Sequence, residues 1–191
     1  MNNYPQYAEV NGHKYKINTD FRVAIECNRI ATDNTIGDYE RALAIIYTLF
    51  GEEGINGHDD LVKLLNVAKK YLLCGKEKID SDDEPDMDYI QDMDYIEASF
   101  MSDYHIDLSN KKMHWWKFYN LMNGLSNSEL GNCCVLNRIR NLRNLDTKDI
   151  KDSKEKQKME EAKQHVALHK KKATKEQEDN AMEVLKELGL L

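Results

Sequence analysis

Apolar residues at helical spacing between residues 61 and 72 constrain the fold more than any other feature of the sequence. Five of them stand at i, i+3, i+4, i+7 and i+11 and so share one face of an α-helix: Leu61, Leu64, Leu65, Ala68 and Leu72. Asp59 and Asp60 precede this stripe, where the helix dipole favours carboxylates, and Gly75 follows it, where a helix can end. A helix with one apolar face has to pack against other elements, so the segment predicts a helical body.

Two more helices and a hairpin are predicted before this segment. Residues 18–31 offer Thr19 or Asp20 as a helix cap, and residues 38–51 carry apolar residues at helical spacing up to Gly51. Residues 7–17 form two short alternating runs around Asn11-Gly12, a pair that supplies the positive φ angles of a two-residue hairpin turn. An isolated hairpin is marginally stable, so we expect it to pack on the helices. The predicted fold is mainly α, with a short N-terminal β-hairpin.

Composition limits the classes of function. The chain has 191 residues, of which 41% are hydrophobic and 32% charged, and this balance suits a helical protein with long solvated faces. A net charge of −7 argues against nucleic acid or an anionic membrane as the main partner. The polar N-terminus and the lack of any run near the roughly 18 apolar residues of a membrane span lead us to expect a cytoplasmic protein with reduced thiols.

The sequence predicts four regions along the chain. They are an N-terminal hairpin plus three-helix region (1–75), an acidic linker (76–86), an aromatic-rich helical region (87–145) and a charged helical C-terminal extension (146–191). The linker is charged and contains Pro85, which favours a solvated segment. Within the extension we expect a long exposed helix over 146–172 and, after a capping box at Thr174 and Gln177, a short apolar stripe that ends at Gly189.

A short duplication lies at the start of the aromatic-rich region. The string DMDYI occurs at 86–90 and again at 92–96. If the segment is one helix, four apolar side chains share a face: Tyr89, Met93, Ile96 and Phe100. The carboxylates around them are compatible with calcium, but residues 80–97 contain no glycine for an EF-hand loop, so a solvated acidic helix face is favoured.

Two adjacent tryptophans stand on the predicted helix of residues 111–125. Adjacent helical residues point about 100° apart, so Trp115 and Trp116 cannot share one narrow face. We expect Trp115 to pack with Phe118 and Met122 in the core, while Trp116 and Tyr119 face a neighbouring element or a partner. Burial of both indoles inside the monomer is the alternative.

The following segment supplies a further predicted helix and three arginines. Ser126 and Glu129 form a capping box before a broad apolar face. Arg138, Arg140 and Arg143 do not form one stripe, and Arg138 is placed to reach the acidic residues 88–97. An inter-helix salt bridge is the favoured interpretation, and an interface arginine is the alternative.

No catalytic motif is present. The sequence lacks a GxSxG elbow, a P-loop and a GxGxxG loop. His165 and His169 have metal-compatible spacing without the glutamate of an HExxH motif, and surface histidines are the simpler interpretation. His114 is interpreted as a capping or packing histidine. No CxxC spacing occurs, and Cys133-Cys134 are expected on a buried helix face, with a vicinal disulfide or metal pair as the alternative. We therefore expect no enzyme activity, no cofactor and no metal.

Three ordered stretches resemble a known family. They are VNGHKYKINTDFR (10–22), DYIEASFMSDYHIDL (94–108) and MHWWKFYNLMNGL (113–125), with an Ile139-Arg140 pair further on. Together they resemble the bacteriophage Gp15-type family of small tail-region proteins of tailed phages and prophages, encoded close to the tape-measure protein. The resemblance covers most of residues 6–143.

The resemblance implies a function rather than a site. It implies a non-enzymatic tail-morphogenesis protein, in particular a tail assembly chaperone that keeps the tape-measure protein soluble in the host cytoplasm. A minor structural component of the tail is the alternative, and a metal-dependent enzyme using the clustered carboxylates is a third. From the residues themselves we select Trp116, Tyr119 and Arg140 as partner-binding candidates and expect self-association, because the apolar stripes are more numerous than one small core needs.

Overall fold

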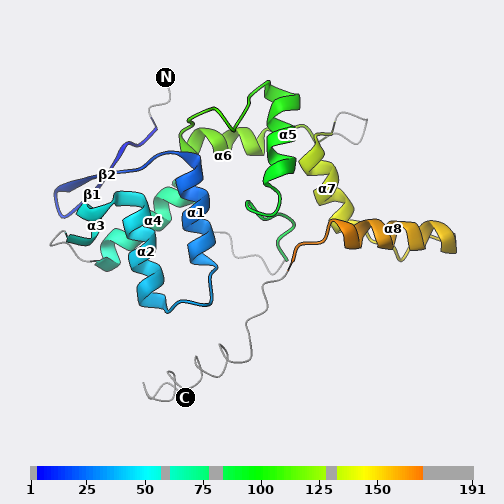
Figure 1. The fold of residues 1–191 in the computed structure, drawn as a ribbon, viewed down its shortest axis with the longest axis horizontal. Helices are drawn as coiled ribbons and strands as arrows, with labels where there is room; N and C mark the ends of the chain where they lie inside the picture. Colours follow the sequence, from blue (N-terminus) through cyan, green and yellow to red (C-terminus); the bar gives the residue numbers. More distant parts are fainter. Residues whose placement is uncertain (1–3, 57–60, 78–83, 128–132, 170–191) are drawn as a thin grey trace, which may run out of the picture. The chain divides into compact units, whose positions relative to one another are not determined.

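The computed structural model describes residues 4–56, 61–77, 84–127 and 133–169. Those residues form a two-stranded antiparallel hairpin followed by helices, so the predicted mainly α fold is confirmed (Figure 1). The elements in chain order are β1 (Tyr7–Val10), β2 (His13–Lys16), α1 (Phe21–Ala31), α2 (Asp38–Phe50), α3 (Glu52–Asn56), α4 (Leu61–Leu72), α5 (Met93–Tyr104), α6 (Trp115–Asn123), α7 (Val135–Asn144) and α8 (Ser153–His165).

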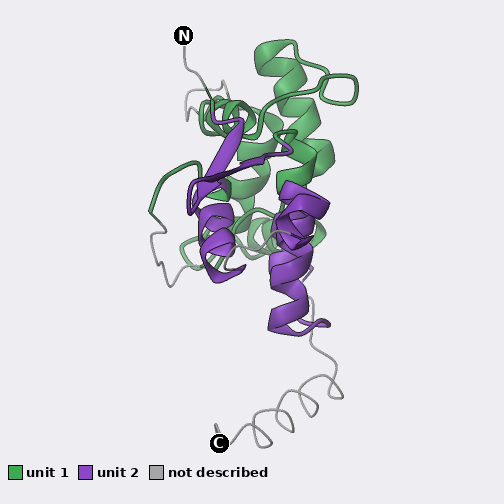
Figure 2. Ribbon diagram, turned by 90° about the vertical axis from the view of Figure 1, so that its left-hand side faces the viewer, with its two compact units in different colours: residues 1–4, 19–25, 72–168 green, residues 5–18, 26–71, 169–191 purple. Residues whose placement is uncertain are grey.

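The chain forms two compact units (Figure 2). One comprises the described residues of 1–4, 19–25 and 72–168, and we call it the aromatic unit. The other comprises those of 5–18, 26–71 and 169–191, and we call it the hairpin unit. The regions drawn from composition, with boundaries at 75, 86 and 145, stay a prediction.

The hairpin turns at Asn11-Gly12 and packs on helices of its own unit. Asn11 and Gly12 have φ angles of 51° and 85°, as the predicted turn requires. Tyr15 is buried with its ring 5.9 Å from that of Phe50, and the Asn18 amide donates to the Leu49 carbonyl at 2.8 Å. The marginal stability of a lone hairpin is thus offset by packing on the end of α2.

The helices of the hairpin unit follow the predicted periodicity, with one addition. α2 ends at Gly51, whose φ is 72°, and α4 buries Leu64 and Ala68 from the predicted stripe. The additional element is the short α3, which packs on α2. A Cβ at Gly54 would lie 2.9 Å from Ile46 Cγ2 and from Phe50 Cβ, so the lack of a side chain permits this close approach. Asp59 and Asp60 lie outside the described residues.

An aromatic stack lies at the core of the other unit. Phe118 of α6 is stacked between Phe21 of α1, at 4.5 Å between ring centroids, and Phe100 of α5, at 5.1 Å. All three side chains are at most 2% exposed. Their segments are far apart in the sequence, so burial of these rings brings α1, α5 and α6 together.

α5 begins later than the duplication suggested. Residues 84–92 are not helical, so the expectation that Tyr89 shares a helix face with Ile96 and Phe100 is wrong. Asp88 Oδ1 accepts hydrogen bonds from the Ile90 and Gln91 amides, both at 2.8 Å, and Asp92 Oδ2 accepts one from the Asp88 amide at 3.0 Å. These side-chain bonds satisfy the backbone in a turn and so compete with the helix.

Two predicted features of the C-terminal part are corrected. α7 begins at Val135, capped by Cys134 Sγ, so the helix start predicted at Ser126 is wrong. The Ser126 amide instead donates to Asp103 Oδ2 at 2.8 Å, and its carbonyl accepts from the Cys134 amide. The long helix expected over 146–172 is shorter, since α8 begins only at Ser153, after the cap Asp152, and ends at His165. Glu129, Thr174, Gln177 and Gly189 lie outside the described residues.

Candidate partner-binding site

Helix α6 carries the two tryptophans and is held at its first turn. His114 Nδ1 accepts a hydrogen bond from the Trp116 amide at 3.0 Å, which caps the helix as the sequence suggested. The Trp115 amide donates to the Thr19 carbonyl at 2.8 Å, and the Phe21 amide donates to the Met113 carbonyl at 2.9 Å. These bonds fix α6 against the start of α1 and thereby set the direction of both indoles.

The two indoles have different environments. Trp115 is 1% exposed, and its Nε1 donates to the Leu72 carbonyl at 2.9 Å, so its polar atom is satisfied in the core as buried indoles require. Trp116 is half-buried and lies against Gly75, where a Cβ would come within 3.3 Å of Trp116 Cη2. One indole therefore belongs to the core, and the other lies against the loop after α4 and remains partly exposed.

Tyr119 lies one turn after Trp115 and has a cation above its ring. It is half-buried, its centroid is 5.8 Å from that of Trp115, and Lys76 Nζ lies 4.8 Å from the ring centroid. Such a contact is attractive because the ring face carries partial negative charge. Trp116 and Tyr119 thus flank the 72–76 segment of the same unit.

Arg140 pairs with the acidic segment that precedes α5. Its Nε is 3.1 Å from Asp86 Oδ1, an ion pair whose atoms are not aligned for a hydrogen bond, and its Nη1 donates to Asn137 Oδ1 at 3.2 Å. Tyr89 lies three residues after Asp86, and its ring meets that of Trp115 edge-on at 5.8 Å between centroids. Burial is the main reason that the pKa of Tyr89 is raised above its usual value.

Arg143 makes the strongest ion pair in this region, and the sequence reasoning did not single it out. Its Nη1 and Nη2 each donate to one carboxylate oxygen of Asp92 at 2.7 Å, and the side chains are only 10% and 1% exposed. It also donates to the carbonyls of Asp86, at 2.9 Å, and Val166, at 2.6 Å. The salt bridge favoured from the sequence is present, but Arg143 and Arg140 make it, whereas Arg138 is exposed.

A signal for this pairing was present in the sequence. The two copies of DMDYI begin six residues apart, and Arg140 and Arg143 stand three apart on the next helix but one. The first aspartate of each copy meets one of these arginines: Asp86 meets Arg140, and Asp92 meets Arg143. The duplication therefore has a structural counterpart that periodicity alone does not show.

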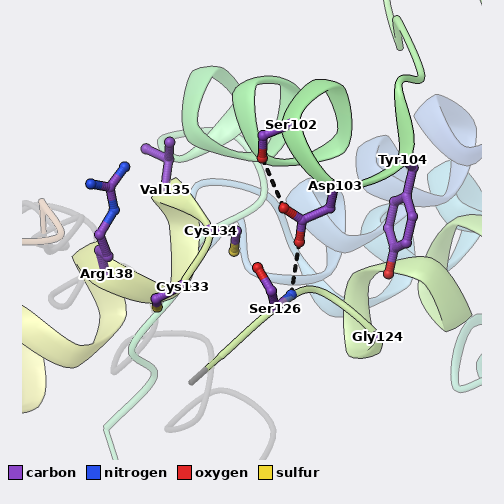
Figure 3. A pocket seen from close by; sticks show the side chains of 9 residues that line it. All are labelled: Ser102, Asp103, Tyr104, Gly124, Ser126, Cys133, Cys134, Val135 and Arg138. Atoms are coloured by element: carbon purple, nitrogen blue, oxygen red, sulfur yellow. Dashed lines mark hydrogen bonds between the residues drawn. The ribbon is translucent and has the colours of Figure 1, made fainter. Parts of the chain in front are cut away.

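A separate hollow of about 550 Å³ lies between the end of α5 and the start of α7 (Figure 3). In it Asp103 accepts hydrogen bonds from the Ser102 hydroxyl at 2.9 Å and the Ser126 amide at 2.8 Å. Burial opposes ionisation of Asp103, but these bonds outweigh it and hold its pKa below the usual value. The nine residues that line the hollow are Ser102, Asp103, Tyr104, Gly124, Ser126, Cys133, Cys134, Val135 and Arg138.

The lining of this hollow places no histidine or lysine beside its serines and cysteines. Burial raises the pKa of the Cys133 thiol, which disfavours the reactive thiolate. Cys134 accepts the Asn137 amide as the cap of α7, and Cys133 and Cys134 are free thiols. Across the described residues, no group of three or more histidine, cysteine, aspartate or glutamate side chains is arranged to hold a metal ion.

The fold and the site define a class of protein: a mainly helical chain with an aromatic core helix and a partly exposed surface of rings and cations. The bacteriophage Gp15 protein family matches this chain over residues 1–168, so the chain belongs to that family, as the three sequence stretches suggested. No curated protein and no solved structure matches it. Among the described helices, none has both the length and the apolar character to cross a membrane.

Proposed function

We propose that this chain is a non-enzymatic tail-morphogenesis protein of a phage or prophage, acting as a tail assembly chaperone that binds the tape-measure protein. It would act in the bacterial host cytoplasm while the tail is assembled. Membership of a phage protein family supports the setting. The observation that supports the binding role is that Trp116 and Tyr119 of α6 are only half-buried and that the exposed Lys76 lies over the Tyr119 ring. The half-buried Arg140, paired with Asp86, is proposed as a further part of this surface.

The chemistry of this surface suits a helical partner. Tape-measure proteins are long helical chains, and an amphipathic helix needs an apolar surface with a charged rim. Aromatic rings bury a large area at low entropic cost, and tyrosine, tryptophan and arginine are enriched among the residues that dominate binding energy. Leu73 and Ile90 of the same unit are 39% and 51% exposed and add to its exposed apolar side chains. Self-association through the same surface is a further expectation of the proposal.

Co-elution of the purified chain with its tape-measure protein tests the binding role. We expect the wild-type chain to co-elute, and Trp116→Ser with Tyr119→Ser to weaken the association about tenfold or more. Tyr39→Ser is the matched control, because Tyr39 is a 64% exposed tyrosine of the other unit. Failure of the wild-type chain to associate, or equal loss with the control variant, would count against the proposal.

The composition of purified virions separates the chaperone from a minor structural component of the tail. A chaperone is displaced by tail-tube subunits, so mass spectrometry should detect it in infected cells and not in mature particles. A stoichiometric amount in purified particles would support the structural role instead.

A further inference from the structure

We infer that the surface around Tyr119 and Arg140 recognises a short segment carrying a carboxylate and an aromatic ring, and that residues 84–90 occupy it as such a segment in the unbound chain. The inference rests on the proposed function, because it names the chemistry of the partner segment at the same surface. The partner segment would then compete with residues 84–90 for that surface.

The two copies of DMDYI show which part of the chain is the occupant. The second copy lies within the aromatic unit's core: Asp92 and Ile96 are both 0% exposed, and the copy continues into α5. The first copy is not helical, and its isoleucine, Ile90, is 51% exposed. The second copy is therefore part of the core, whereas the first copy is only partly buried, with four half-buried residues and one exposed.

The two ion pairs differ in the same way, since the pair of the second copy is buried and the pair of the first copy is partly exposed. Asp92 and Arg143 form two hydrogen bonds of 2.7 Å in a nearly water-free place, where exchange of one partner is costly. Asp86 and Arg140 are 26% and 39% exposed and approach without hydrogen-bond alignment. Asn144 Nδ2 adds a bond to Asp86 Oδ2 at 3.1 Å. The backbone of residues 84–90 also bonds to the inner pair, because Arg143 Nη1 donates to the Asp86 carbonyl at 2.9 Å and the Asp88 amide donates to Asp92 Oδ2 at 3.0 Å. An incoming segment has to replace these two backbone bonds, and its carboxylate can replace that of Asp86 in the partly exposed outer pair.

Tyr89 supplies the aromatic part of the occupant. Its ring meets that of Trp115 edge-on at 5.8 Å and lies 6.4 Å from that of Phe118, so it covers one side of the α6 aromatic cluster. Two cations lie nearby: Lys76 lies above the Tyr119 ring, and Arg140 lies beside Asp86. That arrangement of rings and cations complements an aromatic residue flanked by carboxylates, which is the pattern of Asp86, Asp88 and Tyr89.

A labelled synthetic peptide with the sequence of residues 84–91, EPDMDYIQ, tests this in trans by fluorescence polarisation. The full-length chain with Asp86→Asn and Tyr89→Ala should bind the peptide at least about tenfold more tightly than the wild-type chain, since its own segment no longer competes. Adding Arg140→Ala should abolish that gain. A peptide with its first aspartate changed to asparagine and its tyrosine to alanine should not bind.

Two further variants keep the test decisive. Asp86→Asn alone leaves Tyr89 on Trp115, and it should still tighten peptide binding about threefold, the size expected of a half-exposed ion pair. Asp94→Asn changes an exposed carboxylate of the second copy and should leave peptide binding as in the wild type. Both tryptophans of the chain lie on α6, so intrinsic fluorescence reports whether each variant retains the folded aromatic core.

Each outcome decides one part of the inference. Equal peptide binding by the wild-type and Asp86→Asn chains would overturn occupancy of the surface by residues 84–90. Absence of binding by every folded variant would overturn recognition of a carboxylate with a ring. If the tape-measure protein still co-elutes with the wild-type chain in either case, the proposed function stands and this inference fails. If the peptide binds as expected but the tape-measure protein does not co-elute, the inference stands and the proposed function fails.

Discussion

At the scale of single residues, the pair between Asp92 and Arg143 is the most buried ion pair among the described residues. It joins the start of α5 to α7, and the same guanidinium reaches the carbonyls of Asp86 and Val166. The hydrogen bond to Asp92 is the main reason that the pKa of Arg143 is raised, so the group is charged at every accessible pH. A buried charge with satisfied donors specifies position more than it adds net stability.

Removing one charge of this pair should be costly. Asp92→Asn leaves the Arg143 charge buried without its partner, and we expect the free energy of unfolding to fall by about 3 kcal/mol in urea denaturation. Asp86→Asn is the matched control from the first DMDYI copy, and because that pair is half-exposed its loss should be about 1 kcal/mol or less. Equal losses of unfolding free energy in the two variants would show that the pair of Asp92 with Arg143 contributes no more to stability than the pair of Asp86 with Arg140.

Asp103 should make stability depend on acidity. Its folded pKa lies below the usual 3.8, so the unfolded chain binds more protons as the medium becomes acidic. The stabilisation is complete above the unfolded pKa and is lost as pH falls through the folded one. Between about pH 5 and about pH 3, Asp103→Asn should therefore lose less stability than the wild type in urea denaturation. Parallel curves for the wild type and Asp103→Asn would contradict this expectation.

At the scale of elements, helix α6 depends on its cap as well as on its packing. The His114 ring accepts the Trp116 amide and also stacks on Tyr4, with 5.0 Å between centroids. His114→Ala should lower the free energy of unfolding by about 1 kcal/mol, whereas His114→Asn, which can accept the same amide, should retain most of it. Tryptophan fluorescence during urea unfolding measures both. Equal destabilisation by the two substitutions would assign the effect to the lost ring rather than to the cap.

Which elements could be predicted follows from how local their signals are. The Asn-Gly hairpin, α2 and α4 depend on turn chemistry and apolar spacing within a few residues, and the structure confirms them. The starts of α5 and α7 were predicted too early. Asp88 and Asp92 hold a turn through side-chain bonds, and Ser126 bonds to Asp103 on another helix. Competing polar contacts of this kind leave no periodic trace in a sequence.

The candidate site was predictable to a similar degree. The different environments of Trp115 and Trp116 follow from the helical angle between adjacent residues, and the structure has one indole buried and one half-buried. The pairing of Arg140 with Asp86 depends on how α7 packs against the segment before α5, which sequence spacing cannot provide. Trp116, Tyr119 and Arg140 remain predicted partner-binding residues.

At the scale of the whole molecule, the chain forms two compact units, and the proposed binding surface belongs to the aromatic unit. Of the four aromatic side chains of α6, Trp115 and Phe118 are buried in the core, and Trp116 and Tyr119 are partly exposed. The proposed binding surface is therefore small. A function in tail assembly then requires that this small surface, with the apolar residues around it, be sufficient to hold a much longer chain.

The solubility of the tape-measure protein during co-expression tests that requirement most directly. The account predicts that the tape-measure protein is largely insoluble when expressed alone, that it becomes soluble with the wild-type chain, and that Trp116→Ser with Tyr119→Ser abolishes the rescue. A tape-measure protein whose soluble fraction is unchanged by the wild-type chain would contradict the central claim.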